Sequence, residues 1–230
     1  MDRSLRRAGI AGVVTIWAGL SAGTVLAGFD LLGGRPLSYL GTLPRSEGLF
    51  AAGLAMSAIL FIAFHRYVRS AYPVSSGFTA VMLVGMAGQL VAAFVPIGGD
   101  PALHRIHTTS ALVLAASLPV VMWRFAAAQP PGAWRRLAYT FVWAEVAACA
   151  GGLLLSAADL APVAEILPAA VFHAWILTLT FRPANPRPTV APDAYHRADA
   201  PTHEGGPALG SRARPRVPSG GGRVVRAPVP

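Results

Sequence analysis

Six apolar stretches follow one another along the chain, separated by short polar segments rich in glycine, proline and arginine. Each stretch holds about 17 to 23 residues, enough to cross a hydrocarbon core of about 30 Å at about 1.5 Å per helical residue. The pattern predicts an all-α fold, a polytopic membrane helical bundle with six transmembrane helices. The expected spans are residues 8–27, 48–64, 75–97, 107–122, 137–158 and 162–181.

The first apolar stretch follows Arg3, Arg6 and Arg7 and ends in small residues, as in a secretory signal peptide. Its apolar part is about 20 residues long, against the 7–15 of a signal peptide, and more such stretches follow. We therefore interpret it as a retained first span. Gly19 and Gly23 form a G-x-x-x-G pair, which favours close approach of a second helix but also arises by chance in a chain rich in alanine and glycine.

A change of composition divides the chain into a transmembrane domain, residues 1–181, and a tail, residues 182–230. The tail carries half of all the prolines, eight arginines and three acids, without apolar periodicity. It cannot bury enough surface to offset the entropy of ordering, so we expect a disordered tail. Its positive charge would allow contact with anionic lipid, although a solvated tail satisfies the same pattern.

The charges are few and unevenly distributed. Hydrophobic residues make up 54% of the chain and charged residues 13%, about half the charged share of a soluble domain. The net charge of +9 is spread between apolar blocks and in the tail, a pattern that does not indicate nucleic-acid binding. Placing both termini inside (N-in/C-in) puts eight short-loop arginines inside and three outside, as the positive-inside rule requires. We therefore expect a multi-pass protein of the bacterial cytoplasmic membrane.

With that orientation, polar residues from three separate loops face outward at one end of the bundle. Asp100 followed by Pro101 is a helix-start signature, because the carboxylate accepts from free amides and proline fits the first turn. Residues distant in sequence can converge there in a polar mouth that binds a ligand. Its candidate residues are Asp30, Ser38, Glu47, Asp100, His104, His107 and Glu165.

His104 and His107 are three residues apart, a spacing that places two imidazoles near one face of a helix. Joint metal ligation would need a third ligand, from Asp30, Glu47 or Glu165, and an open position for water. There are two other interpretations. The histidines belong to a polar cluster that is structural or recognises a ligand, or they lie at a helix end exposed to solvent. The single cysteine, Cys149, cannot form an internal disulfide or a cysteine-based metal cluster, and we expect neither a metal nor another cofactor.

Two ionisable residues lie inside expected spans. Glu145 in the fifth and His173 in the sixth lie at similar depth, and the two spans are joined by a tight turn. A hydrogen bond between them would lower the cost of placing each group in lipid, so we predict this pair. The pair would hold the two helices together or take part in a proton-coupled step, with Gln89 as a further polar partner.

Three segments resemble a known family: Pro-Leu-Ser-Tyr-Leu-Gly-Thr at 36–42, Leu-Phe-Ala-Ala-Gly-Leu at 49–54, and the run from Pro96 through Asp100 to His104. The pattern resembles small six-span bacterial membrane proteins of the domain of unknown function 998 family, related to the Frag/DRAM/Sfk group. The resemblance covers roughly residues 8–181 and marks Ser38, Gly41, Asp100 and His104. It implies a setting in lipid and membrane homeostasis without implying a reaction.

These observations favour a membrane protein whose outward mouth recognises a lipid headgroup, a small solute or a partner; they favour recognition over catalysis without excluding an enzyme. The chain has no P-loop, no nucleophile elbow and no H-E-x-x-H motif. Two alternatives stay open: a metal-dependent membrane hydrolase using His104 and His107, and a proton-coupled transporter using Glu145 and His173. The sequence indicates membrane lipid as a partner and identifies no protein partner.

Overall fold

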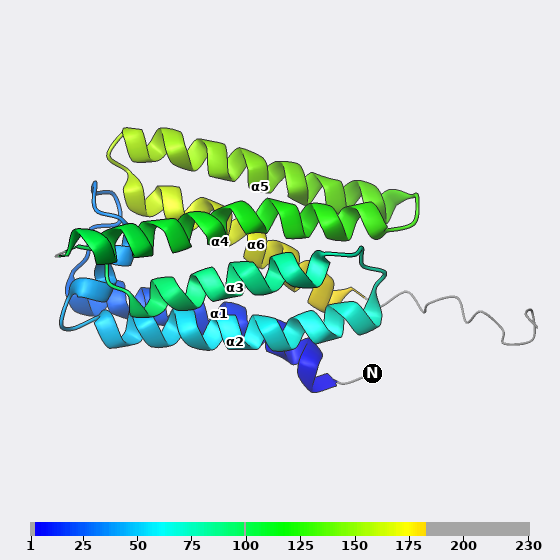
Figure 1. The fold of residues 1–230 in the computed structure, drawn as a ribbon, viewed down its shortest axis with the longest axis horizontal. Helices are drawn as coiled ribbons and strands as arrows, with labels where there is room; N and C mark the ends of the chain where they lie inside the picture. The colour runs from blue at the N-terminus through cyan, green and yellow to red at the C-terminus, as the bar shows by residue number, and fades with distance from the viewer. Residues whose placement is uncertain (1–2, 99, 183–230) are drawn as a thin grey trace, which may run out of the picture. The chain divides into compact units, whose positions relative to one another are not determined.

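The computed structural model describes residues 3–98 and 100–182, and these form helices joined by short connections, with no strand among them (Figure 1). A 3-10 helix, η1, lies in the connection between the first two α-helices. The predicted tail lies outside the described residues. The elements are α1 (Arg3–Ala27), η1 (Leu37–Thr42), α2 (Glu47–Ala71), α3 (Phe78–Phe94), α4 (Pro101–Ala128), α5 (Ala133–Ala157) and α6 (Ala161–Phe181).

Five of these helices, α1, α2, α4, α5 and α6, are long and apolar enough to cross a membrane. The helix α3 is apolar but has 17 residues, or about 25 Å of length. It is shorter than the expected span 75–97 because Gly77 takes a left-handed conformation with φ of 83° before the first turn and Val95 is extended after the last. A residue with a side chain rarely adopts the φ of Gly77.

Helices that follow one another in the chain pack together, and α6 also packs against α1, which closes the bundle into a ring. At the loop end of the bundle α1, α3 and α5 end and α2, α4 and α6 begin; at the terminal end α1 begins and α6 ends (Figure 1). The short connection between α5 and α6 matches the prediction, and its Asp159 has a positive φ of 59°.

Glycines allow two of these helix pairs to approach closely. A Cβ atom added to Gly19 of α1 would lie 2.9 Å from the carbonyl oxygen of Leu49 and 3.1 Å from the Cα atom of Gly53, both on α2. A Cβ atom on Gly152 of α5 would lie 2.8 Å from the carbonyl oxygen of Ala164 on α6. The contact at Gly19 agrees with the G-x-x-x-G pattern in the sequence.

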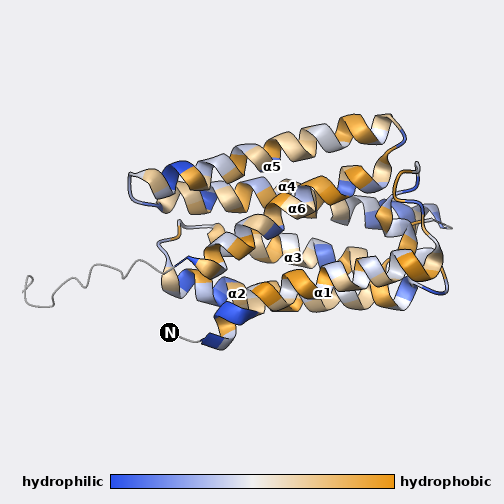
Figure 2. Cartoon of the chain, turned by 180° about the vertical axis from the view of Figure 1, so that it is seen from behind, coloured by the Kyte–Doolittle hydropathy of each residue, from blue (hydrophilic) through white to orange (hydrophobic). Residues whose placement is uncertain are grey.

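The core of the bundle is built largely from aromatic rings of different helices. Phe61 of α2 meets Phe172 of α6 edge to face, with centroids 5.7 Å apart, and Phe125 of α4 meets Trp175 of α6 at 5.6 Å. Hydrophobic residues occur along all of the helices (Figure 2), and many large ones are exposed on the outside; Leu154 of α5, for example, is 75% exposed. A surface of this kind suits contact with lipid.

Charge divides sharply between the two ends. In the described part of the chain the loop end carries Arg35, Arg45 and Arg105 with five acids, Asp30, Glu47, Asp100, Asp159 and Glu165. The described acids include none at the terminal end, which instead carries the other arginines: Arg3, Arg6, Arg7, Arg66, Arg69, Arg124, Arg135, Arg136 and Arg182.

Candidate functional site

Two of the predicted mouth residues meet at the loop end. The side chain of Glu165, in the second turn of α6, accepts a hydrogen bond through Oε2 from the backbone N–H of Ser38, at 3.3 Å. Ser38 lies in the first turn of η1, where free amides need acceptors and the N-cap residue Pro36 offers no side-chain cap. Glu165 supplies that acceptor from another helix, so its first role is to fasten η1 to α6.

Asp30 and Glu47 do not join this contact. Asp30 Oδ1 accepts from the backbone N–H of Leu32 at 2.9 Å, so the carboxylate closes a local turn in the first loop. Glu47 is exposed in the first turn of α2, where a negative charge complements the helix dipole.

Asp100 is the N-cap of α4, as the sequence predicts. Its Oδ1 accepts from the backbone N–H of Ala102 at 2.7 Å, and Pro101 is the first residue of the helix. The helix α4 therefore begins six residues before the expected span at 107.

The two histidines of α4 have different surroundings. His107 is 3% exposed, and its Nδ1 lies 2.6 Å from the carbonyl oxygen of Val95, directly after α3. A carbonyl only accepts, so Nδ1 carries the proton and donates it. His104 is exposed to solvent. His107 thus fastens the turn between α3 and α4, and the structure gives the pair no shared ligand position.

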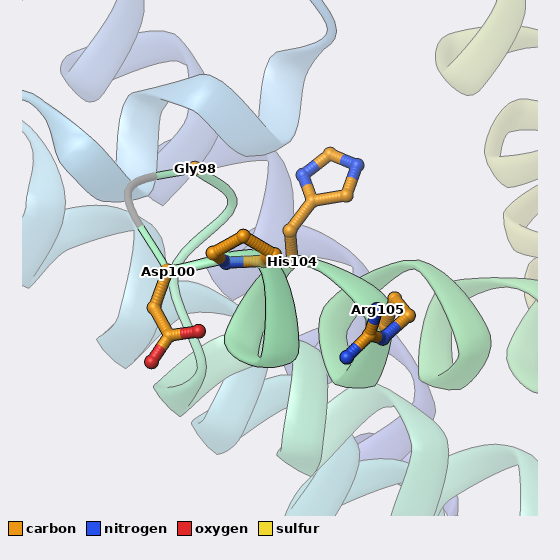
Figure 3. Close-up of a pocket in the computed structure, with 5 residues that line it drawn as sticks. Gly98, Asp100, His104 and Arg105 are labelled. Atoms are coloured by element: carbon orange, nitrogen blue, oxygen red, sulfur yellow. The ribbon is translucent and has the colours of Figure 1, made fainter.

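A shallow depression lies at the start of α4, at the loop end of the bundle (Figure 3). The imidazole of His104 and the carboxylate of Asp100 point to different sides of the chain there. Over residues 3–98 and 100–182 no ion pair or hydrogen bond involves the side chain of His104 or of Arg105. The depression is lined by Gly98, Asp100, Pro101, His104 and Arg105.

Metal ligation was one interpretation of these residues. Among the described residues, no group of three or more histidine, cysteine, aspartate or glutamate side chains lies in an arrangement that could hold a metal ion. Of the proposed third ligands, Asp30 and Glu165 are hydrogen-bonded to backbone amides, and Glu47 is exposed in the first turn of α2.

The predicted hydrogen bond between Glu145 and His173 is absent. Glu145 is fully buried; its Oε1 faces the thiol of Cys149 at 3.9 Å and its Oε2 has no partner. His173 is also buried, and its Nδ1 has no partner. The prediction compared the positions of the two residues along their helices. It did not account for the direction in which each side chain points about its helix axis.

The packing of α6 gives the reason. Ala164 faces α5, because it lies against Gly152. His173 is nine residues further on, or two and a half turns at 3.6 residues per turn, and so lies on the opposite side of α6. There its ring contacts Trp17 of α1 and Phe61 of α2, each with a centroid separation of 5.6 Å.

Gln89, the suggested further partner, also points elsewhere. Its Nε2 donates to the carbonyl oxygen of Leu54 at 2.9 Å and to the hydroxyl of Ser57 at 2.7 Å. These two bonds join α3 to α2 inside the bundle.

Sequence reasoning missed a polar network at the terminal end. Gln129, after α4, donates through Nε2 to the carbonyl oxygen of Pro73 at 2.9 Å and accepts through Oε1 from the indole N–H of Trp134 at 3.1 Å. The hydroxyl of Tyr72 donates to the carbonyl oxygen of Leu179 at 3.0 Å. Burial raises the pKa of the Tyr72 hydroxyl, so it remains a donor. In the sequence, the only feature that draws attention to this region is the turn at Pro130 and Pro131, directly after Gln129.

Sequence reasoning also missed a groove between α1, η1 and α6, which combines three distant segments. Its lining is apolar apart from two hydroxyls: Trp17, Leu20, Ser21, Thr24, Val25, Leu31, Leu37 and Ile166.

Comparisons with protein-family models, with curated proteins and with solved structures gave no match to this chain.

Proposed function

We propose that this chain is a six-span integral protein of the bacterial cytoplasmic membrane, with both termini on the cytoplasmic side, which recognises a lipid headgroup at its loop end. The division of charge supports the orientation, because arginines concentrate on the cytoplasmic side of membrane proteins. A 17-residue α3 is at the short end of the usual range for a span, and a bilayer accommodates a mismatch of a few ångströms at modest cost. The resemblance to the domain of unknown function 998 family supports the same setting.

One observation carries the recognition of a headgroup. Asp100, His104 and Arg105 line one depression, and the two basic side chains have no partner in the described structure. A phospholipid headgroup carries a phosphate, which accepts from a guanidinium or an imidazole, and in zwitterionic lipids also an ammonium, which suits a carboxylate. The open shape of the depression suits a headgroup held at the membrane surface.

The test uses full-length protein with isotope-labelled histidine in detergent, titrated with a short-chain phospholipid. We expect saturable shifts of the His104 imidazole signals, assigned with His104→Ala, and about tenfold weaker binding in Arg105→Gln, the effect of losing about 1.4 kcal/mol. Arg45→Gln, at the same end of the bundle, is the matched control. Absent shifts, or equal weakening in both arginine variants, would refute the proposal.

A second candidate is a proton-coupled step at Glu145. It is supported by the fully buried carboxyl group with one unpartnered oxygen, a type of group that marks proton pathways in membrane proteins. The test is proton flux into liposomes containing the protein. Glu145→Gln abolishes flux and leaves folding intact if this candidate is right; unchanged flux rejects it.

A further inference from the structure

The groove between α1, η1 and α6 is a second concave feature, on other elements than the depression at the start of α4. Its α1 residues run from Trp17 to Val25, close to the last residue of that helix, Ala27. Eight helical steps cover about 12 Å. This inference rests on the proposed membrane-spanning function: with α1 and α6, both long and apolar enough to span, crossing the bilayer, the groove lies at the depth of the hydrocarbon in the leaflet at the loop end.

The floor of the groove is held in place by packing. The Trp17 ring meets His173 edge to face, and His173 in turn lies against Phe61. Ser21 and Val25 are exposed along the same side of α1, so the side chains of the helix leave the groove open. Because its lining is apolar apart from two hydroxyls, the groove suits a flexible hydrocarbon chain.

The loop end next to the groove carries five acids and three arginines. Asp30 precedes the lining residue Leu31, Glu165 precedes the lining residue Ile166, and Asp159 lies beside Gly34 in the same loop cluster. Of the two arginines in the first loop, Arg45 is exposed to solvent and Arg35 stacks over the ring of Tyr39 at 5.1 Å. This balance of charge is complementary to an ammonium group and unfavourable to a purely anionic headgroup.

We propose that the groove binds one acyl chain of a phospholipid whose headgroup carries an ammonium group, with that headgroup at the loop end beside Asp30. The chain lies along α1 from Val25 to Trp17, and Ile166 and Leu37 close its other side.

Native mass spectrometry of the full-length protein, purified with phosphatidylethanolamine and stripped by detergent exchange, tests the groove. We expect one retained lipid per chain in the wild type and about tenfold lower occupancy in Ser21→Trp, which fills the groove. Leu154→Trp, on the exposed side of α5, is the matched control and keeps its lipid. Equal occupancy in all three proteins, or a dimer in place of a lipid adduct, overturns the proposal.

Quenching of tryptophan fluorescence gives a second measurement that does not depend on a bulky substitution. In nanodiscs with a small fraction of phosphatidylethanolamine brominated in its acyl chains, the wild type shows a saturable quenching component. This component is lost in Trp17→Phe and kept in Trp143→Phe, which removes an exposed ring of α5. A component that survives Trp17→Phe overturns the proposal.

The headgroup is tested by replacing the brominated lipid with brominated phosphatidylglycerol at the same fraction. We expect the Trp17 component to fall by about tenfold, and Asp30→Asn to reduce the difference between the two lipids. Equal or stronger quenching by phosphatidylglycerol overturns the choice of headgroup.

Discussion

The carboxylate of Glu165 and the backbone N–H of Ser38 form a hydrogen bond of 3.3 Å between segments 127 residues apart. Because Glu165 caps η1 from α6, Glu165→Ala leaves amides of η1 without an acceptor, and we expect a loss of about 1 kcal/mol in the free energy of unfolding. Glu165→Gln keeps an acceptor and loses less. Glu47→Ala, an exposed acid at the same end, is the control; unfolding by a denaturing detergent measures all three, and equal losses in both alanine variants would contradict the cap.

The hydrogen bond between His107 and the carbonyl oxygen of Val95 leads to a second prediction. His107→Ala removes a buried ring and leaves the carbonyl oxygen of the partly buried Val95 without its donor, so we expect a loss of about 1–3 kcal/mol in unfolding free energy. His104 is exposed and unpartnered, so His104→Ala changes stability by less than about 0.5 kcal/mol. The same detergent unfolding measures both variants, and a reversed order of the two losses would refute the assignment.

The same two variants test the hypothesis that the protein is a metal-dependent hydrolase. If His104 and His107 shared a metal ion, either substitution would release it. Because only His107 is buried and its Nδ1 is already bonded, we expect equal transition-metal content in wild type and both variants. Elemental analysis of purified protein checks this, and a matched loss of one equivalent in both variants would establish a metal site shared by the two histidines.

Gly151 and Gly152 allow a test of the spacing between α5 and α6. A Cβ atom on Gly152 meets the carbonyl oxygen of Ala164 at 2.8 Å, whereas one on Gly151 has nothing within 4 Å. Gly152→Leu must push the two helices apart, and we expect a loss of about 1–3 kcal/mol in unfolding free energy. Gly151→Leu points into open space and is neutral or slightly stabilising, because leucine favours the helix.

The proposed orientation is tested by labelling single cysteines in a Cys149→Ser background. Leu32 is 72% exposed at the loop end, and Ala133 is exposed at the terminal end. In right-side-out membrane vesicles an impermeant maleimide labels Leu32→Cys and leaves Ala133→Cys unmodified; inside-out vesicles give the opposite result. Labelling of both positions from one side contradicts six spans, and exchange of the two results contradicts the orientation.

The hydrophobic pattern predicted where the helices lie and how charge divides between their ends. It predicted the first and last residues of the helices less accurately. The helix α2 continues from Phe64 to Ala71, because helical backbone bonds continue through polar residues. The helix α3 is shorter than its apolar stretch, because the turn before it requires the left-handed Gly77.

The sequence predicted which residues belong to the candidate site better than it predicted the contacts that these residues make. Depth along a helix follows from counting residues, but the direction of a side chain depends on rotation about the axis and on the neighbouring helix. This is why Glu145 and His173, at similar depth, face different helices. His107 and His104 are similar by spacing, and only the packing of α3 against α4 distinguishes the buried residue from the exposed one.

The closure of the ring by α6 against α1 also sets an order of events during synthesis. The guanidinium Nε of Arg6 donates to the carbonyl oxygen of Thr180 at 2.6 Å, across 174 residues. The pair α1 and α2 can associate as soon as both are inserted, but one side of α1 stays uncovered until the last helix leaves the ribosome. Because Ile166 and Glu165 belong to α6, the groove and the cap of η1 are completed only when translation of α6 is complete.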